Sequence, residues 1–269
     1  MSARATWLWL LVVPFRLLAQ QPDDDPEPSP AHAPLWQGTY ATAYLGLGRL
    51  PLTNTAGVFE VVYTDESGFN EPLSAQRTLK NRGSDLAVVV GGSYGRIGGS
   101  HWGLEVALGT SNPFQIGFAP QYGYNFTWGR AVVRPTLGLG FYWAILGFGR
   151  VPNSPFGLVV NGTELLTDEL RLSAVQFRML LTPGLEVVRP LSARLALGLA
   201  AHYRVGLAEN AARLRLSETE VEYPATEVER LSEPNVLLVR GGTQVTGPDL
   251  PFGTLGLAAS LRLHIRVDY

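Results

Sequence analysis

The chain has 269 residues and a formal net charge of −2, and only 16% of its residues are charged, against about 25% in a typical soluble domain. It contains no cysteine, which excludes disulfides, thiolate metal sites, a cysteine nucleophile and a lipid anchor on cysteine. The near-neutral charge gives no sign of nucleic-acid binding.

The N-terminal segment predicts export. Residues 1–19 have the organisation of a secretory signal peptide, with Arg4 as the positive start, an apolar core over residues 5–15 and a Leu-Leu-Ala cleavage site. The alternative is a short membrane anchor, but this core is shorter than the roughly 20 residues that a spanning helix needs. Residues 20–36 are dense in Pro and Asp, so we expect a flexible periplasmic leader there.

Strand-like alternation then dominates the chain. A period of two places alternate residues on opposite faces of a strand. In the last five segments one face is apolar throughout, while the other carries Gly, Gln, Glu and Arg. The eight segments with this pattern are residues 37–50, 85–97, 101–110, 114–127, 131–147, 172–188, 193–207 and 255–269.

The direction of the alternation decides between two all-β folds. A soluble β-sandwich or lipocalin-like barrel would place polar residues on the outer face of some strands. An apolar outer face opposite a polar, glycine-rich one is typical of strands that face lipid. The sequence therefore predicts a transmembrane antiparallel up-and-down β-barrel of eight strands over residues 37–269.

The connections between these segments support that topology. Three of them are long, at residues 51–84, 148–171 and 208–251, and they alternate with tight turns. In outer-membrane barrels the turns are periplasmic and the long loops extracellular, so we expect both termini in the periplasm.

The long loops contain further β-prone stretches, which leaves a ten-stranded barrel as an alternative. These stretches are residues 58–63, 214–223 and 236–240. The second one carries Glu218, Glu220 and Glu222 on one face, and we therefore favour strand extensions that rise above the membrane. Since the first and last loops flank neighbouring strands in a closed barrel, their extensions are expected to pair.

The C-terminal strand carries the resemblance to a known family. Its ending, LRLHIRVDY, resembles the C-terminal assembly signal of bacterial outer-membrane β-barrel proteins, although most of them end in Phe rather than Tyr. The residues that match this signal are Leu261, Leu263, Ile265, Val267 and Tyr269. With the export signal and the eight strands, the chain resembles the small outer-membrane barrel superfamily, which includes the OmpA transmembrane domain, OmpX and the PorT-like barrels. The resemblance implies contact with the barrel assembly machinery, outer-membrane localisation, and structural, adhesion or secretion-accessory roles.

The polar faces predict a network inside the barrel. An eight-stranded barrel has an interior that side chains just fill, and buried charges there must pair. We therefore expect a packed polar lumen, with a narrow path for ions or small solutes as the alternative. The expected network consists of Glu105, Arg134, Arg178, Glu186, Arg194, His202, Arg204, Arg262, His264 and Arg266.

No catalytic or metal-binding set emerges from the sequence. Ser173 lies near the outer rim, but no outward histidine is placed to activate it. His202 and His264 lie on adjacent strands and are expected to form hydrogen bonds in the lumen. We therefore expect a protein that is not an enzyme and needs no cofactor or metal. Its expected role is structural, adhesive or surface-binding through the loops; the alternatives are a pore and a lipid A- or phospholipid-modifying enzyme. The expected partners are outer-membrane lipid, lipopolysaccharide, the assembly machinery and an extracellular protein ligand, without nucleic acid.

Overall fold

The computed structural model describes most of the chain after the leader. The described residues are 36–51, 57–65, 71–79, 84–209, 212–219, 221, 224–231, 233–244 and 256–267. The predicted signal peptide, the leader up to residue 35, and Tyr269 lie outside them. Within these ranges no helix has the length and apolar character needed to cross a membrane.

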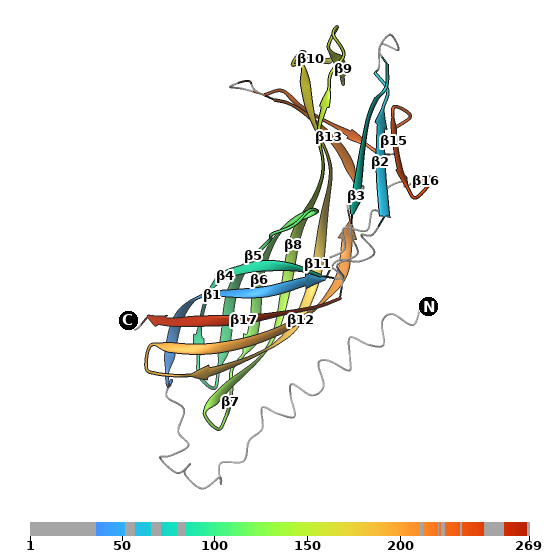
Figure 1. Cartoon of the computed structure of the whole chain (residues 1–269). Coiled ribbons are helices and arrows are strands. Elements are labelled where there is room, and N and C mark those ends of the chain that lie inside the picture. The colour runs from blue at the N-terminus through green and yellow to red at the C-terminus, as the bar shows by residue number, and fades with distance from the viewer. Residues whose placement is uncertain are drawn as a thin grey trace. The chain divides into compact units, whose positions relative to one another are not determined.

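Eight antiparallel strands form a closed ring, as predicted (Figure 1). Each strand pairs with the next, and the last pairs with the first, with Leu45 opposite Leu263 at the closing seam. A short strand, β7 (Phe126–Trp128), pairs with the beginning of β8. The ring strands are β1 (Thr39–Pro51), β4 (Ser84–Arg96), β5 (Ser100–Gly109), β6 (Phe114–Tyr124), β8 (Ala131–Pro152), β11 (Glu169–Pro190), β12 (Leu195–Glu209) and β17 (Gly256–Val267).

The ring has its apolar side chains outside and its charges inside. Leu199 and Leu261 are 62% and 49% exposed, whereas Arg134 and Arg262 are 0% and 2% exposed. This arrangement is the reverse of a soluble protein, in which arginine is almost never fully buried. Lipid covers such an outer surface, and the fold is therefore a transmembrane β-barrel.

Aromatic pairs mark both ends of the apolar band. The rings of Trp102 and Tyr122 lie 4.7 Å apart near the tight turns, and those of Trp143 and Phe177 lie 5.0 Å apart toward the long loops. Barrels of this class carry such girdles at both membrane interfaces.

Above the barrel, the long loops form a folded extension rather than irregular chain. β8 and β11 continue upward, and β13 (Arg213–Glu218) and β14 (Thr226–Arg230) add to them in the order β8-β11-β13-β14. A second sheet has the order β16-β15-β2-β3, and a hairpin joins β9 to β10. The strands of the second sheet are β2 (Gly57–Tyr63), β3 (Leu73–Leu79), β15 (Val236–Arg240) and β16 (Thr243–Gln244). The hairpin consists of β9 (Leu158–Val160) and β10 (Thr163–Leu165).

The first and last loops pair with each other, as the sequence predicted. β2 and β15 are antiparallel, with Val61 opposite Leu238. The β-prone stretches thus extend the structure above an eight-stranded barrel and do not enter its ring.

The extension has its own apolar core. Phe59, Val61 and Tyr63 of β2 lie in one buried cluster with Leu172 of β11 and Leu214 of β13. Since the core occupies the inner face of the β8-β11-β13-β14 sheet, the opposite face of that sheet is left to the exterior of the molecule.

A β-bulge decides which residues of β8 reach this exterior face. On β11 the consecutive residues Leu172 and Ser173 pair with Gly149 and Gly147 of β8. Phe148 is therefore the extra residue at which the register between the two strands shifts. Gly149 follows with φ 105°, a conformation that side chains other than glycine rarely adopt. Below the bulge Leu146 is buried, above it Val151 is buried, and Arg150 therefore points outward.

Candidate functional site

Eight of the ten residues expected in the lumen are buried there. They are Glu105, Arg134, Arg178, Glu186, His202, Arg204, Arg262 and His264. Arg194 was assigned wrongly: it is exposed in a turn, because β12 starts only at Leu195, whose carbonyl accepts the backbone N–H groups of Leu191 and Ser192. Arg266 is half-buried near the tight-turn end and donates to the Gln37 carbonyl at 3.4 Å.

Glu186 is the centre of the lower part of this network. Its carboxylate lies 3.3 Å from Arg134 and 3.4 Å from Arg262, and its Oε1 lies 3.0 Å from Nε2 of His264. Arg134 also donates to Asn125 at 2.7 Å. One carboxylate thus faces two guanidinium groups, which compensates part of the cost of burying them.

Glu105 provides the second negative charge. Arg262 donates to it directly, and Gln121 donates at 3.5 Å. Nε2 of His202 lies 3.9 Å from the same carboxylate and 3.1 Å from Arg262. The contacts run from Arg134 to Glu186, then to Arg262, and then to Glu105. These four side chains therefore alternate in charge and together have no net charge.

Three tyrosines support the buried arginines, and sequence reasoning gave them no role; the first is Tyr40, with Arg134 5.0 Å above its ring. Arg262 lies 4.8 Å above the ring of Tyr44, and Arg204 lies 4.7 Å above that of Tyr142. The Tyr142 ring occupies the space that a Cβ at Gly117 would need. The sequence contains a signal for this packing, because Gly117 of β6 pairs with Tyr142 of β8 and leaves room for its ring.

The described side chains close both ends of the lumen. At the tight-turn end Trp36 packs with Val132, Val188 and Ala196, and its Nε1 donates to the Ser192 carbonyl at 3.0 Å. Trp36 was expected to belong to the flexible leader, yet it is fully buried. At the other end the apolar core of the extension covers the barrel.

The side chains of the polar network between these closures are buried. A cavity of about 10 Å³ lies beside Glu105, His202 and Arg204, enough for about one water molecule. The described part of the chain contains no group of three or more metal-ligating side chains. The geometry of the lumen is that of a plug.

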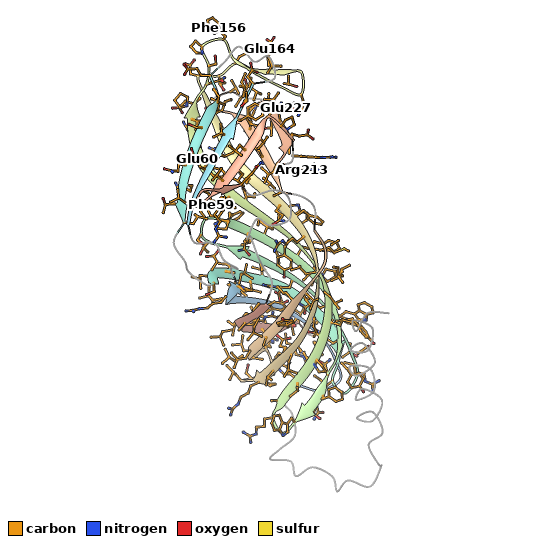
Figure 2. The ribbon with its side chains drawn as sticks, turned by 90° about the vertical axis from the view of Figure 1, so that its right-hand side faces the viewer. Phe59, Glu60, Phe156, Glu164, Arg213 and Glu227 are labelled. Atoms are coloured by element: carbon orange, nitrogen blue, oxygen red, sulfur yellow. The ribbon has the colours of Figure 1, made fainter. Side chains whose placement is uncertain are left out.

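A different group of charges lies on the outer surface of the extension. The exterior face of the β8-β11-β13-β14 sheet, the arginine face, carries five exposed arginines: Arg150, Arg171, Arg213, Arg215 and Arg230. Figure 2 labels Arg213, which lies nearer to the barrel than Phe156 and Glu164 at the far end of the extension.

Like charges oppose each other directly on this face. Arg171 pairs with Arg150 across β11 and β8, and Arg213 pairs with Arg230 across β13 and β14. Arg150 lies 3.4 Å from Glu169, with both side chains about half exposed. Within the described chain, the other four arginines form no hydrogen bond or ion pair through their side chains.

The arginine face begins where the apolar band ends. Ile145, Val175 and Arg213 lie side by side on adjacent strands, and Trp143 and Phe177 occupy the next row toward the barrel. Arg213 is therefore at the level of the lipid headgroups, and Arg171 lies four residues farther along β11 toward the tip of the extension.

A hollow of about 770 Å³ opens on this face. Arg150, Arg171 and Arg215 line it together with Arg77 of β3. Glu218 also lines it, but its two carboxylate oxygens accept the backbone N–H groups of Leu166 at 2.8 Å and Ala225 at 3.1 Å. Sequence reasoning missed this site, because its arginines come from four strands, β3, β8, β11 and β13, and the bulge breaks the alternation before Arg150.

Comparison with known proteins gives one named similarity. No protein-family model matches the chain, and no curated protein matches it. Among solved structures the chain is similar to the outer membrane protease OmpT from Escherichia coli, with 12% identity and a TM-score of 0.29, over 84% of this chain and 94% of that one. The eight-stranded ring described above, with its apolar exterior, is that of an outer-membrane β-barrel.

The comparison corrects one expectation. The sequence was interpreted as a non-enzymatic structural or adhesion protein, whereas the similar solved barrel is a protease. Outer-membrane barrels thus include enzymes, and we withdraw the exclusion of catalysis. A likeness at this TM-score does not transfer protease activity to this chain.

Proposed function

We propose that this outer-membrane barrel binds the phosphate groups of the outer-leaflet glycolipid, lipopolysaccharide, through its arginine face. The observation that carries the proposal is the pair of directly opposed arginines, Arg150 with Arg171, beside Arg215 at the rim of one hollow. A phosphate presents several acceptor oxygens, and the planar guanidinium group is suited to hold them in bidentate fashion.

The energetics of the empty face favour an anionic ligand. Directly opposed like charges in a sheet are destabilising, by roughly 0.2–1 kcal/mol for each pair. Within the described chain, four of the five arginines have no side-chain partner that would offset this repulsion. An anion between them would convert the repulsion into charge-assisted hydrogen bonds.

The position of the face selects the source of the anion. Its first row, with Arg213, is level with Ile145 and Val175 at the top of the lipid-facing surface. A phosphate at this height belongs to the headgroup region, so the lipid reaches the arginines while its acyl chains stay in the membrane.

Binding to purified lipid A tests the proposal. The refolded protein in an uncharged detergent is titrated with diphosphoryl lipid A, and bound lipid is counted by native mass spectrometry. The variant R150Q/R171Q/R215Q should bind about 100-fold more weakly, because it loses three charge-assisted contacts of at least about 1 kcal/mol each. The matched control R96Q/R189Q/R194Q removes three exposed arginines at the opposite end of the barrel and should bind as the unmodified protein does.

Two results would contradict the proposal. One is equal affinity of the two triple variants for lipid A. The other is equal affinity of the unmodified protein for diphosphoryl and fully dephosphorylated lipid A.

The proposal includes a route to the membrane. Residues 1–19 would direct export, and the terminal strand would be recognised by the barrel assembly machinery, as in the small barrels related to OmpA and OmpX. The outward exposure of Leu261, Leu263 and Ile265 supports this role for the terminal strand.

A further inference from the structure

A trench crosses the lipid-facing surface of the barrel, on strands other than those that carry most of the arginine face. Its row of outward residues runs Leu185, Ala201, Ala259 and Arg49 on β11, β12, β17 and β1. Figure 1 shows β12, β17 and β1 side by side. The hollow measures about 520 Å³.

Two alanines form the floor of the trench, and larger side chains form its walls. On the side of the tight turns, Leu199, Leu261 and Leu47 occupy the next outward row. On the side of the extension, Tyr203 and Leu257 lie opposite each other. The alanines are thus the low points between two raised rows of an otherwise leucine-rich surface.

Arg49 closes one end of the trench, two residues before β1 ends at Pro51. It is exposed, and it forms no hydrogen bond or ion pair with its side chain among the described residues. Its strand neighbours are Ala259 on one side and Leu86 on the other. An outward arginine in the lipid-facing band of a barrel is unfavourable unless an anion or water reaches it.

The dimensions of the trench admit one hydrocarbon chain. The raised rows lie four residues apart along each strand, or about 14 Å between Cα atoms, and their side chains narrow this gap. Along the floor, the three strand spacings from Leu185 to Arg49 amount to about 14 Å. The trench is wide enough for a single extended chain, its floor lies beside the carboxylate end of that chain, and one cation there matches one anionic group.

We propose that the trench binds a long-chain fatty acid, with the acyl chain over Ala201 and Ala259 and the carboxylate on Arg49. The site is independent of the arginine face, since it lies on the lipid-facing wall of the barrel and uses a different cation.

Photolabelling in a zwitterionic bilayer tests this site. The mature protein is placed in phosphatidylcholine nanodiscs with palmitic acid that carries a diazirine in the middle of its chain, and labelled peptides are identified by mass spectrometry. Label is expected on β11, β12 and β17, and unlabelled palmitate should displace it. Hexadecanol, which lacks the charge, should displace it much less.

Two variants and two matched controls separate the site from general lipid contact. R49Q removes the cation, and A201L/A259L fills the trench; each should lower the specific labelling by about tenfold. R189Q removes another exposed arginine, and A41L/A43L enlarges two small outward residues of β1 outside the trench, so both should label as the unmodified protein does. The heat-dependent gel shift of each variant reports its folding, and R49Q keeps the test decisive if A201L/A259L does not fold.

Three results would overturn the proposal: label spread evenly over all lipid-facing strands, unchanged labelling of R49Q, or displacement by hexadecanol or phosphatidylglycerol as strong as by palmitate. The two lipid proposals fail separately. R150Q/R171Q/R215Q should label normally with palmitate, and R49Q should bind lipid A normally.

Discussion

Glu186 offers the sharpest test of the polar lumen. Its side chain is 4% exposed and contacts Arg134 at 3.3 Å and Arg262 at 3.4 Å. The substitution Glu186→Gln keeps the shape of the side chain and one acceptor oxygen but removes the charge. Arg134 then loses its carboxylate partner, and Arg262 keeps only Glu105.

The expected loss follows from the cost of an uncompensated buried charge. Removal of one partner from a buried ion pair typically costs about 3–5 kcal/mol. Because glutamine still accepts one hydrogen bond, we expect the free energy of unfolding to fall by about 3 kcal/mol, at the lower end of that range. This loss is large compared with the roughly 5–15 kcal/mol that stabilise a typical domain.

Urea unfolding in lipid vesicles, followed by tryptophan fluorescence, measures this change. The matched control is Glu169→Gln, which breaks the ion pair with Arg150 at a similar distance of 3.4 Å, but with both side chains about half exposed. We expect the control to change the free energy by at most about 1 kcal/mol, because solvent screens exposed pairs. Equal effects of the two substitutions would refute the reasoning that burial makes the lumen network energetically important.

Two further predictions concern the closure of the barrel and the pairing of its loops. Trp36→Ala should lower the free energy of unfolding by about 3–5 kcal/mol, as expected for a buried tryptophan, whereas Trp128→Ala, at a residue that is 78% exposed, should change it by no more than about 0.5 kcal/mol. Equal urea midpoints for the two variants would place Trp36 in a flexible leader after all. In the cysteine-free chain, Val62→Cys with Leu237→Cys should form a disulfide, because these residues are direct cross-strand partners. The mismatched pair Val62→Cys with Val239→Cys should stay reduced, and non-reducing gels or thiol titration would show the reverse if the register were wrong.

The barrel itself follows from local pattern. A strand has a period of two, so one face of each segment must be the lipid face, and a shift by one residue would expose every polar side chain to lipid. For this reason alternation alone predicts the eight strands and the inward positions of Glu105, Glu186 and Arg262. Arg194 escapes the rule because the pattern does not show where the turn gives way to the strand.

Sites that combine distant segments required the tertiary structure. The arginine face joins Arg150, Arg171 and Arg213 only after the bulge at Phe148 reverses the outward face of β8 and after β13 pairs with β11. Likewise, the trench exists because Ala201 and Ala259 come to lie opposite each other. Alternation in the sequence thus determined the barrel and its inner face, since each strand must separate lipid from lumen. The positions of neighbours across strands depend on register and bulges, which arise from long-range pairing and are not encoded in any one segment.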